Sequence, residues 1–383
     1  MMPPLLLLFC LVNLVIGTGA FVISPVLALV AQGLGVGVPA AGQAITAYAL
    51  STAVLAPLAL IVTASWPRRR VMLAALAVFT VGNAVCALAP SLGALLLGRV
   101  LMGVGAVFTP VAAGLAVTLV EPARRGQALA FVFLGISLSY VISLPLGAWL
   151  GLQYGWRVPL AASAALAVLA WAAVWVRVPR DVQAGAGNFD GLPALLRRAE
   201  VLWVLATTLA YFTAIFTVFS YIGPVLQALS PMGAGMTALT LMLFGCSGVA
   251  GTLIGGAAND RFGPHRTQGV QMLLLAAMML ALPLTAGHWP AMMAVLVLWG
   301  TAGFGMMAPQ QSRLAALAPT QAPLLFSFNS SMLYLGTAAG AALGGVAAPL
   351  VGFAQLPWVG VSGALLGLLL LALSGPRRRA RAH

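Results

Sequence analysis

Long apolar runs alternate with short polar breaks along the whole 383-residue chain. One helix needs roughly 20 apolar residues to cross a bilayer core about 30 Å thick, and runs of that length recur between the breaks. The pattern predicts an all-α integral membrane protein with twelve transmembrane helices in two sets of six. The first set is expected at residues 5–31, 41–63, 71–89, 92–120, 127–151 and 157–178. The second set is expected at residues 201–228, 235–258, 267–286, 290–317, 323–350 and 355–374.

A single long polar stretch, "RVPRDVQAGAGNFDGLPALLRRAE", separates the two sets. The halves on either side resemble each other weakly, because "TPVAAG" at Thr109 and "APQQSR" at Ala308 occupy corresponding places in the fourth helix of each set. Paired six-helix halves are the pattern of secondary transporters, although similar composition alone also produces such a likeness. We therefore expect two pseudo-symmetric bundles with short connecting segments. The predicted units are an N-terminal bundle (1–178), a linker (179–200), a C-terminal bundle (201–376) and a basic tail (377–383).

All 18 basic residues are arginine, and most of them fall in every second break. These arginines are 68–70, 124–125, 177, 180, 197–198, 261, 266, 313, 377–379 and 381. Alternate breaks such as "AQGLGVGVPA", "LAPSLGA" and "AGHWPA" contain none. Short loops rich in arginine stay in the cytoplasm, so the alternation predicts that both termini are cytoplasmic. The formal net charge of +13 could also indicate nucleic-acid binding, but that needs a contiguous basic face, and we expect no nucleic-acid partner.

Composition supports the membrane assignment and narrows the function. Hydrophobic residues make up 62% of the chain and charged residues 6%, and the mean hydropathy is +1.07. Soluble domains carry about a quarter charged residues. We therefore expect a monomeric, multi-pass protein of the inner (plasma) membrane, surrounded by lipid. The sequence lacks the GxSxG, HExxH and Walker A signatures, so we expect no enzyme, no metal site and no cofactor.

Charged residues cluster in the break between the eighth and ninth predicted helices, "GGAANDRFGPHR". Gly256 permits close contact with a neighbouring helix, Gly263 can adopt the positive φ of a tight turn, and Asp260 can cap or pair across an interface. Arg261 and Arg266 can anchor the turn at anionic headgroups. The spacing G-x-x-x-D-R-x-G-x-x-R resembles the cytoplasmic-loop signature of the major facilitator superfamily, in which it implies a gating loop. An ordinary charged loop is the alternative.

Three longer stretches carry the same resemblance across nearly the whole chain. "IGTGAFVISPVLALVAQGLGVGVPAAGQAITAYAL" resembles the first two helices of the efflux branch that contains the arabinose-efflux and chloramphenicol-resistance permeases. "APSLGALLLGRVLMGVGAVFTPVAAG" resembles the fourth helix of that family, whose basic residue falls on Arg99. "GISLSYVISLPLGAWLGLQYGWR" resembles the antiporter fifth helix at Gly135, Pro145 and Gly147. The resemblance implies the major facilitator fold, alternating access and export of small drug-like or sugar-like molecules.

The chain departs from the family pattern where protons are usually carried. Ala20 stands where efflux relatives have an acid, and the first-half loop "TASWPRRR" lacks the Gly and Asp of the signature. The acids of the chain are Glu121, Asp181, Asp190, Glu200 and Asp260. All are predicted in loops or at a helix edge, whereas proton-coupled transporters usually place one at mid-membrane depth. Proton antiport through a boundary acid such as Glu200 and passive facilitation both stay open, as do a non-transporting receptor and a lipid translocator on the same fold.

Arg99 is the one charge predicted well inside a membrane helix. An arginine at a helix centre costs on the order of 2.5–3.5 kcal/mol on insertion scales, so it needs a polar partner or a water-filled cavity. Arg99 is therefore a candidate for binding an anionic or polar substrate. The alternative is a structural arginine that binds backbone carbonyls of the first helix near Gly17–Gly19.

Neutral polar residues predicted inside the membrane are the other candidates for substrate binding. They are Asn13, Gln43, Tyr48, Tyr140, Tyr211, Tyr221, Gln310, Gln311, Asn329 and Tyr334. Such groups suit neutral or weakly charged substrates with an aromatic or sugar-like surface. For each of them, hydrogen bonding between helices is the alternative role. Prolines 25, 110, 145, 224 and 309 fall inside predicted helices and are expected to kink them.

Overall fold

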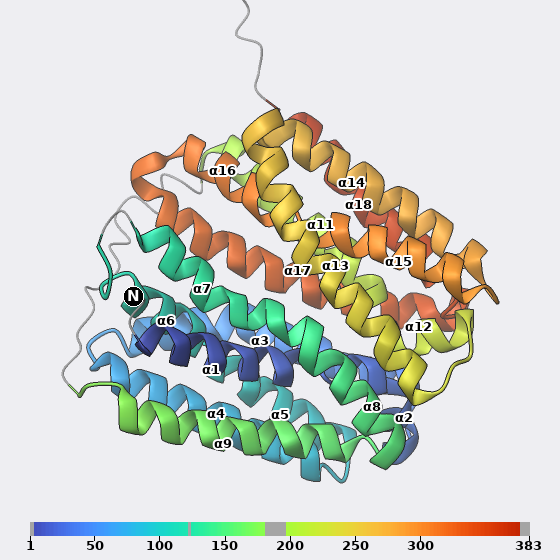
Figure 1. The fold of residues 1–383 in the computed structure, drawn as a ribbon, viewed down its shortest axis with the longest axis horizontal. Coiled ribbons are helices and arrows are strands. Elements are labelled where there is room, and N and C mark those ends of the chain that lie inside the picture. Colours follow the sequence, from blue (N-terminus) through green and yellow to red (C-terminus); the bar gives the residue numbers. More distant parts are fainter. Residues whose placement is uncertain (1–3, 122–123, 181–196, 376–383) are drawn as a thin grey trace, which may run out of the picture.

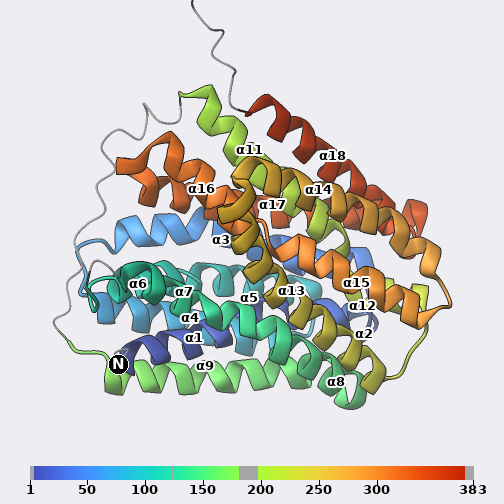
Figure 2. The same ribbon diagram turned by 45° about the horizontal axis from the view of Figure 1, so that its top comes forward.

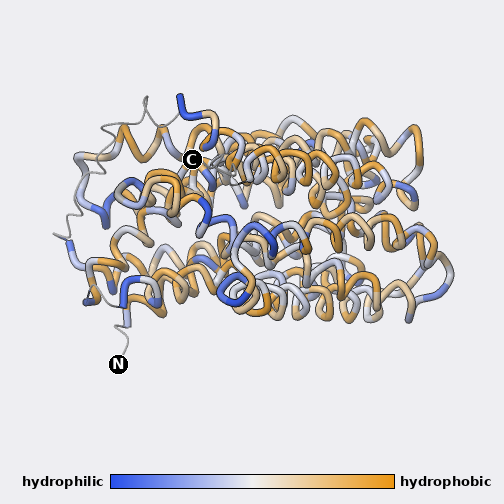
Figure 3. The backbone as a smooth tube through the Cα atoms, turned by 90° about the horizontal axis from the view of Figure 1, so that it is seen from above, coloured by the Kyte–Doolittle hydropathy of each residue, from blue (hydrophilic) through white to orange (hydrophobic). Residues whose placement is uncertain are grey.

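The computed structural model describes residues 4–121, 124–180 and 197–375, and every regular element in these ranges is helical. Twelve helical segments within them are long and apolar enough to cross a membrane, as the pattern predicted. Figure 3 shows hydrophobic residues along most of each helix, with hydrophilic ones gathered mainly near the ends. The centre of the predicted linker and the basic tail lie outside the described residues.

The elements follow one another as two sets of six spans (Figure 1). The N-terminal half contains α1 (Pro4–Phe21), η1 (Ser24–Val26), α2 (Leu27–Leu34), α3 (Val38–Val62), α4 (Arg68–Leu88), α5 (Leu92–Gly105), α6 (Phe108–Ala116), α7 (Arg125–Leu138), η3 (Ser139–Ser143), α8 (Leu144–Tyr154) and α9 (Arg157–Arg177). The C-terminal half contains α11 (Ala199–Phe219), α12 (Ile222–Leu229), α13 (Ala234–Phe262), α14 (Pro264–Ala281), η4 (Leu282–Thr285), α15 (Trp289–Phe304), α16 (Met307–Leu317), η5 (Pro319–Gln321), α17 (Ala322–Val351) and α18 (Leu356–Leu373).

Proline interrupts five of the spans well inside their length. Proline has no N–H to donate, and its ring clashes with the carbonyl four residues earlier, so the helix opens just ahead of it. The predicted kinks are all present as helix breaks, which precede Pro25, Pro110, Pro145, Pro224 and Pro309. The break before Pro145 takes the form of the π-helical segment η3. Pro57 and Pro349, in contrast, lie inside α3 and α17 without ending them.

Close helix contacts at small residues hold the N-terminal half together. A Cβ atom built on Gly135 of α7 would lie 1.9 Å from the carbonyl oxygen of Cys10 in α1. A Cβ atom on Gly147 of α8 would lie 2.2 Å from Cγ2 of Val22. Both glycines belong to the predicted antiporter helix, and both make the close approach that small residues permit between membrane helices.

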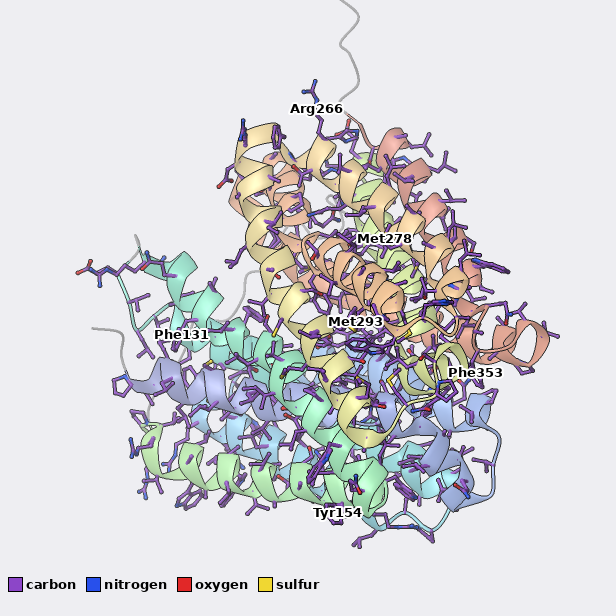
Figure 4. All side chains as sticks on the ribbon, turned by 45° about the vertical axis from the view of Figure 1, so that its right-hand side comes forward. Phe131, Tyr154, Arg266, Met278, Met293 and Phe353 are labelled. Atoms are coloured by element: carbon purple, nitrogen blue, oxygen red, sulfur yellow. The ribbon has the colours of Figure 1, made fainter. Side chains whose placement is uncertain are left out.

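The two halves converge at one end of the molecule and diverge at the other (Figures 1 and 2). α17 packs along α3, α13 packs against η3 and α8, and α12 packs against α2. At the converging end, a Cβ atom on Gly223 would lie 2.1 Å from the Pro25 carbonyl oxygen. The diverging ends carry most of the arginines, and Arg266 projects away from the helices there (Figure 4).

One arginine departs from the predicted alternation. Arg157 begins α9 at the converging end, where its Nη2 donates to the Ala89 carbonyl oxygen at 3.0 Å. Its guanidinium also lies over the Trp156 ring, 4.2 Å from the centroid. The converging end is therefore poor in arginine rather than free of it.

The contact between α1 and α7 generates a stability prediction. Gly135→Ala places a methyl group against the Cys10 backbone and should lower the free energy of unfolding by about 1–3 kcal/mol through overpacking. Gly256→Ala is the matched control, because a Cβ atom there meets no other atom within 4 Å. It should be neutral or slightly stabilising, since alanine is the better helix former. Thermal unfolding of the purified protein in detergent tests both variants, and equal melting temperatures would contradict the contact.

Candidate functional site

A small enclosed pocket lies between the two halves near the middle of the spans. Its volume is about 50 Å³, which is room for a few water molecules and less than the 300–1,000 Å³ typical of ligand sites. Its lining consists of Tyr140, Phe212, Ile215, Phe216, Phe219, Gly303, Phe304 and Met307. The pocket is thus an apolar, mainly aromatic space that a ligand would have to widen.

Four rings at helix breaks form the centre of this site. Phe21 ends α1, Tyr140 lies in η3, Phe219 ends α11 and Phe304 ends α15. The Tyr140 ring stacks on Phe21 at 4.7 Å between centroids and meets Phe304 edge-on at 4.8 Å. The Tyr140 and Phe219 rings lie 5.8 Å apart. Because two of the rings come from each half, the cluster spans the boundary that must open during any rocking of the halves.

A second layer of rings surrounds the centre on the C-terminal side. Phe216 and Phe219 meet at 5.5 Å, and Phe219 stacks on Phe244 of α13 at 5.8 Å. Phe244 also lies 5.2 Å from Trp299 of α15. Aromatic pairs at such distances contribute about 0.5–1.5 kcal/mol beyond their buried area, so this wall is rigid relative to the opening between the halves.

The π-helical segment η3 explains why Tyr140 points into the boundary. Pro145 lies four residues after Val141, so the carbonyl of Val141 has no α-helical donor and the backbone widens there. The widened backbone packs directly on α13, because a Cβ atom on Gly245 would lie 2.4 Å from the Tyr140 carbonyl oxygen. In the predicted antiporter helix, the break at Pro145 therefore places Tyr140 in the lining of the pocket.

None of the described residues that line the pocket is charged. Among the described residues, the carboxylates Glu121, Glu200 and Asp260 are all exposed. Glu200 lies 3.8 Å from Arg198, and both side chains are largely in solvent. The site can therefore contact a ligand through ring faces and the Tyr140 hydroxyl, but it offers no described acid for proton exchange.

Arg99 is fully buried in α5 but does not line the pocket. Its Nη1 and Nη2 donate to the carbonyl oxygens of Gly19 and Ala20, each at 2.7 Å, and its Nε donates to Ala44 at 3.1 Å. The guanidinium also lies 5.0 Å from the centroid of the Tyr48 ring. These are the contacts expected of the structural alternative for Arg99, since Gly19 lies within the predicted Gly17–Gly19 and Ala20 follows it directly.

Three of the predicted polar candidates take part in hydrogen-bond networks between helices. Asn13 donates to the Val132 carbonyl at 3.0 Å and accepts from Thr109 at 2.7 Å, which ties α1, α6 and α7 together. In the other half, Gln310 Nε2 donates to Thr208 at 2.6 Å. Thr208 in turn donates to Asn329 at 2.6 Å, linking α16, α11 and α17. The two halves thus contain similar networks on corresponding spans.

The predicted tyrosines divide into packing residues and residues near the pocket. Tyr211 donates to the Ala302 carbonyl at 2.6 Å, and Tyr221 donates to the Ala341 carbonyl at 2.9 Å; both are fully buried. Tyr140 lines the pocket. Tyr48 and Tyr334 are not part of its lining, and Tyr48 lies beside the Arg99 guanidinium instead.

The predicted gating loop forms the turn between α13 and α14 at the diverging end. Gly263 has φ +80°, as expected for a tight turn that favours glycine. Asp260 is exposed and accepts a hydrogen bond from Asn259 at 3.2 Å, while Arg261 lies over the Phe262 ring. The expected close contact at Gly256 is wrong for this structure, because no atom lies within 4 Å of a Cβ built there.

Gly255 makes the close contact in place of Gly256. A Cβ atom on it would lie 2.3 Å from the Gly305 carbonyl oxygen, and one on Gly251 would lie 2.2 Å from that of Thr301. The side of α13 that bears these two glycines faces its own half. The side that bears Gly256 makes no such close contact, because no atom lies within 4 Å of a Cβ built there.

Sequence reasoning missed most of the pocket because it looked for polar groups. The missed rings that line or support the pocket are Phe21, Phe212, Phe216, Phe219, Phe244 and Phe304. One signal was available, since Phe21, Tyr140, Phe219 and Phe304 each precede an interrupting proline by four or five residues. An aromatic residue at that spacing stands at a helix break, where side chains leave the regular helical face.

Comparison with known proteins agrees with this architecture. Residues 9–322 match the family model of the Major Facilitator Superfamily. The chain is 32% identical to the inner membrane transport protein YdhP of Escherichia coli, over 95% of this chain and 94% of that protein. It is 28% identical to a probable sugar efflux transporter of Pasteurella multocida, over 95% and 90% of the two chains.

Solved structures share the fold at low sequence identity. A bacterial homologue of the human lysosomal transporter Spinster, in an inward-facing and occupied conformation, superposes with a TM-score of 0.83 at 16% identity. A D-xylose–proton symporter superposes with a TM-score of 0.79 at 14% identity. Each comparison covers 96% of both chains. Twelve apolar spans, two six-span halves and a family match over most of the chain lead to one conclusion: this protein belongs to the major facilitator superfamily and is a multi-pass transporter of the inner membrane.

Proposed function

We propose that the protein exports small, neutral molecules with an aromatic, drug-like surface. The observation that carries the proposal is the ring cluster at the boundary, to which each half contributes two side chains. Ring faces bind flat apolar ligands well, and bound ligand would replace the ring–ring contacts that now fill the space. A sugar would need several donors and acceptors for its hydroxyl groups, and the Tyr140 hydroxyl is the only side-chain hydroxyl in the pocket lining.

The arrangement of the halves supports alternating access as the mechanism of this export. The proposed units are a bundle of residues 1–178 and a bundle of residues 201–376, joined by the linker 179–200 and followed by the tail 377–383. The boundary is closed at the arginine-poor end and diverges toward the arginine-rich end. Arginine-rich loops favour the cytoplasm, so both termini are placed there and this conformation presents its divergent side to the cytoplasm. Export requires the opposite end to open in turn.

Among the described residues, the absence of an acid near the pocket favours a passive facilitator over a proton antiporter. The described carboxylates are all exposed, and of the described histidines His265 lies at the start of α14 while His288 is exposed just before α15. Proton coupling needs a titrating group whose protonation is linked to the substrate site. Glu200, at the start of α11, is the boundary acid that we propose as the candidate for the antiport alternative.

The ring cluster generates the first transport prediction. Tyr140→Ala and Phe219→Ala each remove a ring that contacts both halves, and should lower transport of an aromatic substrate at least tenfold. Each contact between such a ring and an aromatic ligand is worth about 0.5–1.5 kcal/mol, and each variant removes a ring that contacts several others of the cluster and would contact the ligand in their place. Phe133→Ala is the matched control, since that ring is 44% exposed on α7. Efflux of fluorescent aromatic dyes from cells tests this, and unchanged efflux in both pocket variants would contradict the site.

A flux assay in proteoliposomes separates sugars from aromatic molecules as substrates. Proteoliposomes loaded with labelled sugars or with aromatic dyes should release the dyes faster, and Tyr140→Ala should affect only the dyes. Faster release of sugars by the wild-type protein would favour the sugar-efflux alternative. Saturable binding of a dye without any flux would instead indicate a receptor.

The coupling mode generates a second transport prediction. A facilitator should transport its substrate at rates that differ by less than about twofold whether the pH gradient across proteoliposomes is absent, inward or outward. The Glu200→Gln variant should behave like the wild-type protein. A rate that follows the pH gradient, and that loses this dependence in Glu200→Gln, would establish antiport through Glu200 instead.

The role of Arg99 can be decided by comparing stability with transport. If Arg99 is structural, Arg99→Ala leaves buried carbonyl oxygens unpaired and should destabilise the protein by about 1–3 kcal/mol for each. The melting temperature should fall by several degrees, while transport per folded molecule is retained. An unchanged melting temperature with lost transport would instead place Arg99 in the transport mechanism.

A further inference from the structure

A second cavity lies on the outer face of the N-terminal half, far from the ring cluster. It sits between the start of α4 and the end of α9 and has a volume of about 610 Å³. Figure 1 shows α4 and α9 side by side at the edge of the molecule, away from the C-terminal half. We call this cavity the Arg–Trp groove. Its lining consists of Trp66, Pro67, Arg69, Arg70, Leu73, Ala74, Ala77, Trp171, Trp175 and Arg180.

Three arginines give the mouth of the groove a positive charge. Arg70 lies over the Trp66 ring, 4.5 Å from the centroid, and Arg69 lies over the Trp175 ring at 5.1 Å. Arg69 also donates to the Trp175 carbonyl oxygen, but its Nε is buried without a hydrogen-bond partner. Arg180 is exposed at the rim. Among the described lining residues there is no carboxylate, so the groove combines excess positive charge with an unused buried donor.

The inner part of the groove is apolar and opens toward lipid. Leu73, Ala74 and Ala77 form a shallow floor along α4. Trp171 and Trp175 form the opposite wall, stacked at 5.4 Å with 19° between their planes. The outer surface of α9 is apolar and exposed at residues such as Val176 and Leu169, which are 74% and 64% accessible. Such a face of a membrane-spanning segment is expected to contact acyl chains, and the arginines at the end of the span are expected at the level of the lipid headgroups.

We propose that the Arg–Trp groove binds an anionic phospholipid. The phosphate would lie among Arg69, Arg70 and Arg180, where Nε of Arg69 gains an acceptor, and one acyl chain would follow the floor at Ala74 and Ala77. Basic pockets between membrane helices on the arginine-rich side suit anionic headgroups. A free phosphate would leave the apolar floor and the tryptophan wall without a ligand. A zwitterionic lipid would not neutralise the three arginines.

Lipid titration of the purified full-length protein tests the proposal. Native mass spectrometry would compare phosphatidylglycerol with phosphatidylcholine for the wild-type protein and two double variants. R70Q/R180Q removes two charges from the groove and should weaken phosphatidylglycerol binding about tenfold or more. R124Q/R125Q is the matched control, because it removes two exposed charges at the start of α7, outside the lining of the groove. It should retain wild-type affinity.

Stability measurements provide a second readout in the same samples. Phosphatidylglycerol should raise the melting temperature of the wild-type protein and of R124Q/R125Q, but not that of R70Q/R180Q. Phosphatidylcholine should raise none of them to the same extent. Millimolar inorganic phosphate should not displace the lipid, and displacement would identify a site for free anions instead. Equal lipid binding by both double variants, or equal binding of the two lipids, would overturn the proposal.

Discussion

The fold depends on how backbone carbonyls are satisfied where a membrane helix is broken in the middle of the bilayer. Water is absent there, so a carbonyl freed by proline must find a donor within the protein. α1 ends at Phe21, ahead of Pro25, and the carbonyls of Gly19 and Ala20 belong to its unpaired last turn. Arg99 donates to both, and its positive charge lies at the helix end that attracts cations. One buried arginine thus makes an interior break in α1 tolerable and binds α5 to α1 and α3.

The breaks in turn build the site. Each interrupting proline opens its helix at about the depth where the halves meet, and an aromatic residue stands at four of the five breaks. The same pattern recurs in α15, where Tyr211 donates to Ala302 and Thr252 donates to the terminal residue Phe304. Polar residues therefore hold the broken ends in place, while rings projecting from those ends fill the boundary. Because polar and aromatic residues have these separate roles, the polar side chains are mostly hydrogen-bonded within the protein and the pocket wall is apolar.

The sequence alone was sufficient to predict the membrane spans, but it was insufficient to predict the residues of the candidate site. Helix edges such as Val38–Val62 and Leu356–Leu373 lie within a few residues of the predicted 41–63 and 355–374, because hydropathy and helix length are local properties. The turn at Gly263 was predictable for the same reason. Phe219 and Phe304 were not, since a phenylalanine that lines a pocket and one that faces lipid have the same hydropathy. Gly256 shows a second limit of the sequence. Its spacing resembles a family signature, but a close contact at Gly256 depends on how the helices are arranged, and no local sequence pattern encodes that arrangement.

The boundary between the halves is built to separate. Among the described residues, and leaving Arg68 aside, the side-chain hydrogen bonds that join two helices lie within one half of the protein. The Asn13 and Gln310 networks are examples. Across the boundary the closest approaches involve glycine against backbone, as at Gly223 and Gly245, or ring against ring, as at Tyr140. Such contacts are lost gradually and leave no buried donor or acceptor unpaired, so opening this end avoids the penalty of broken buried hydrogen bonds. Under the proposed alternating access, strong polar bonding inside each half and apolar contact between them would let the two halves exchange one closed end for the other.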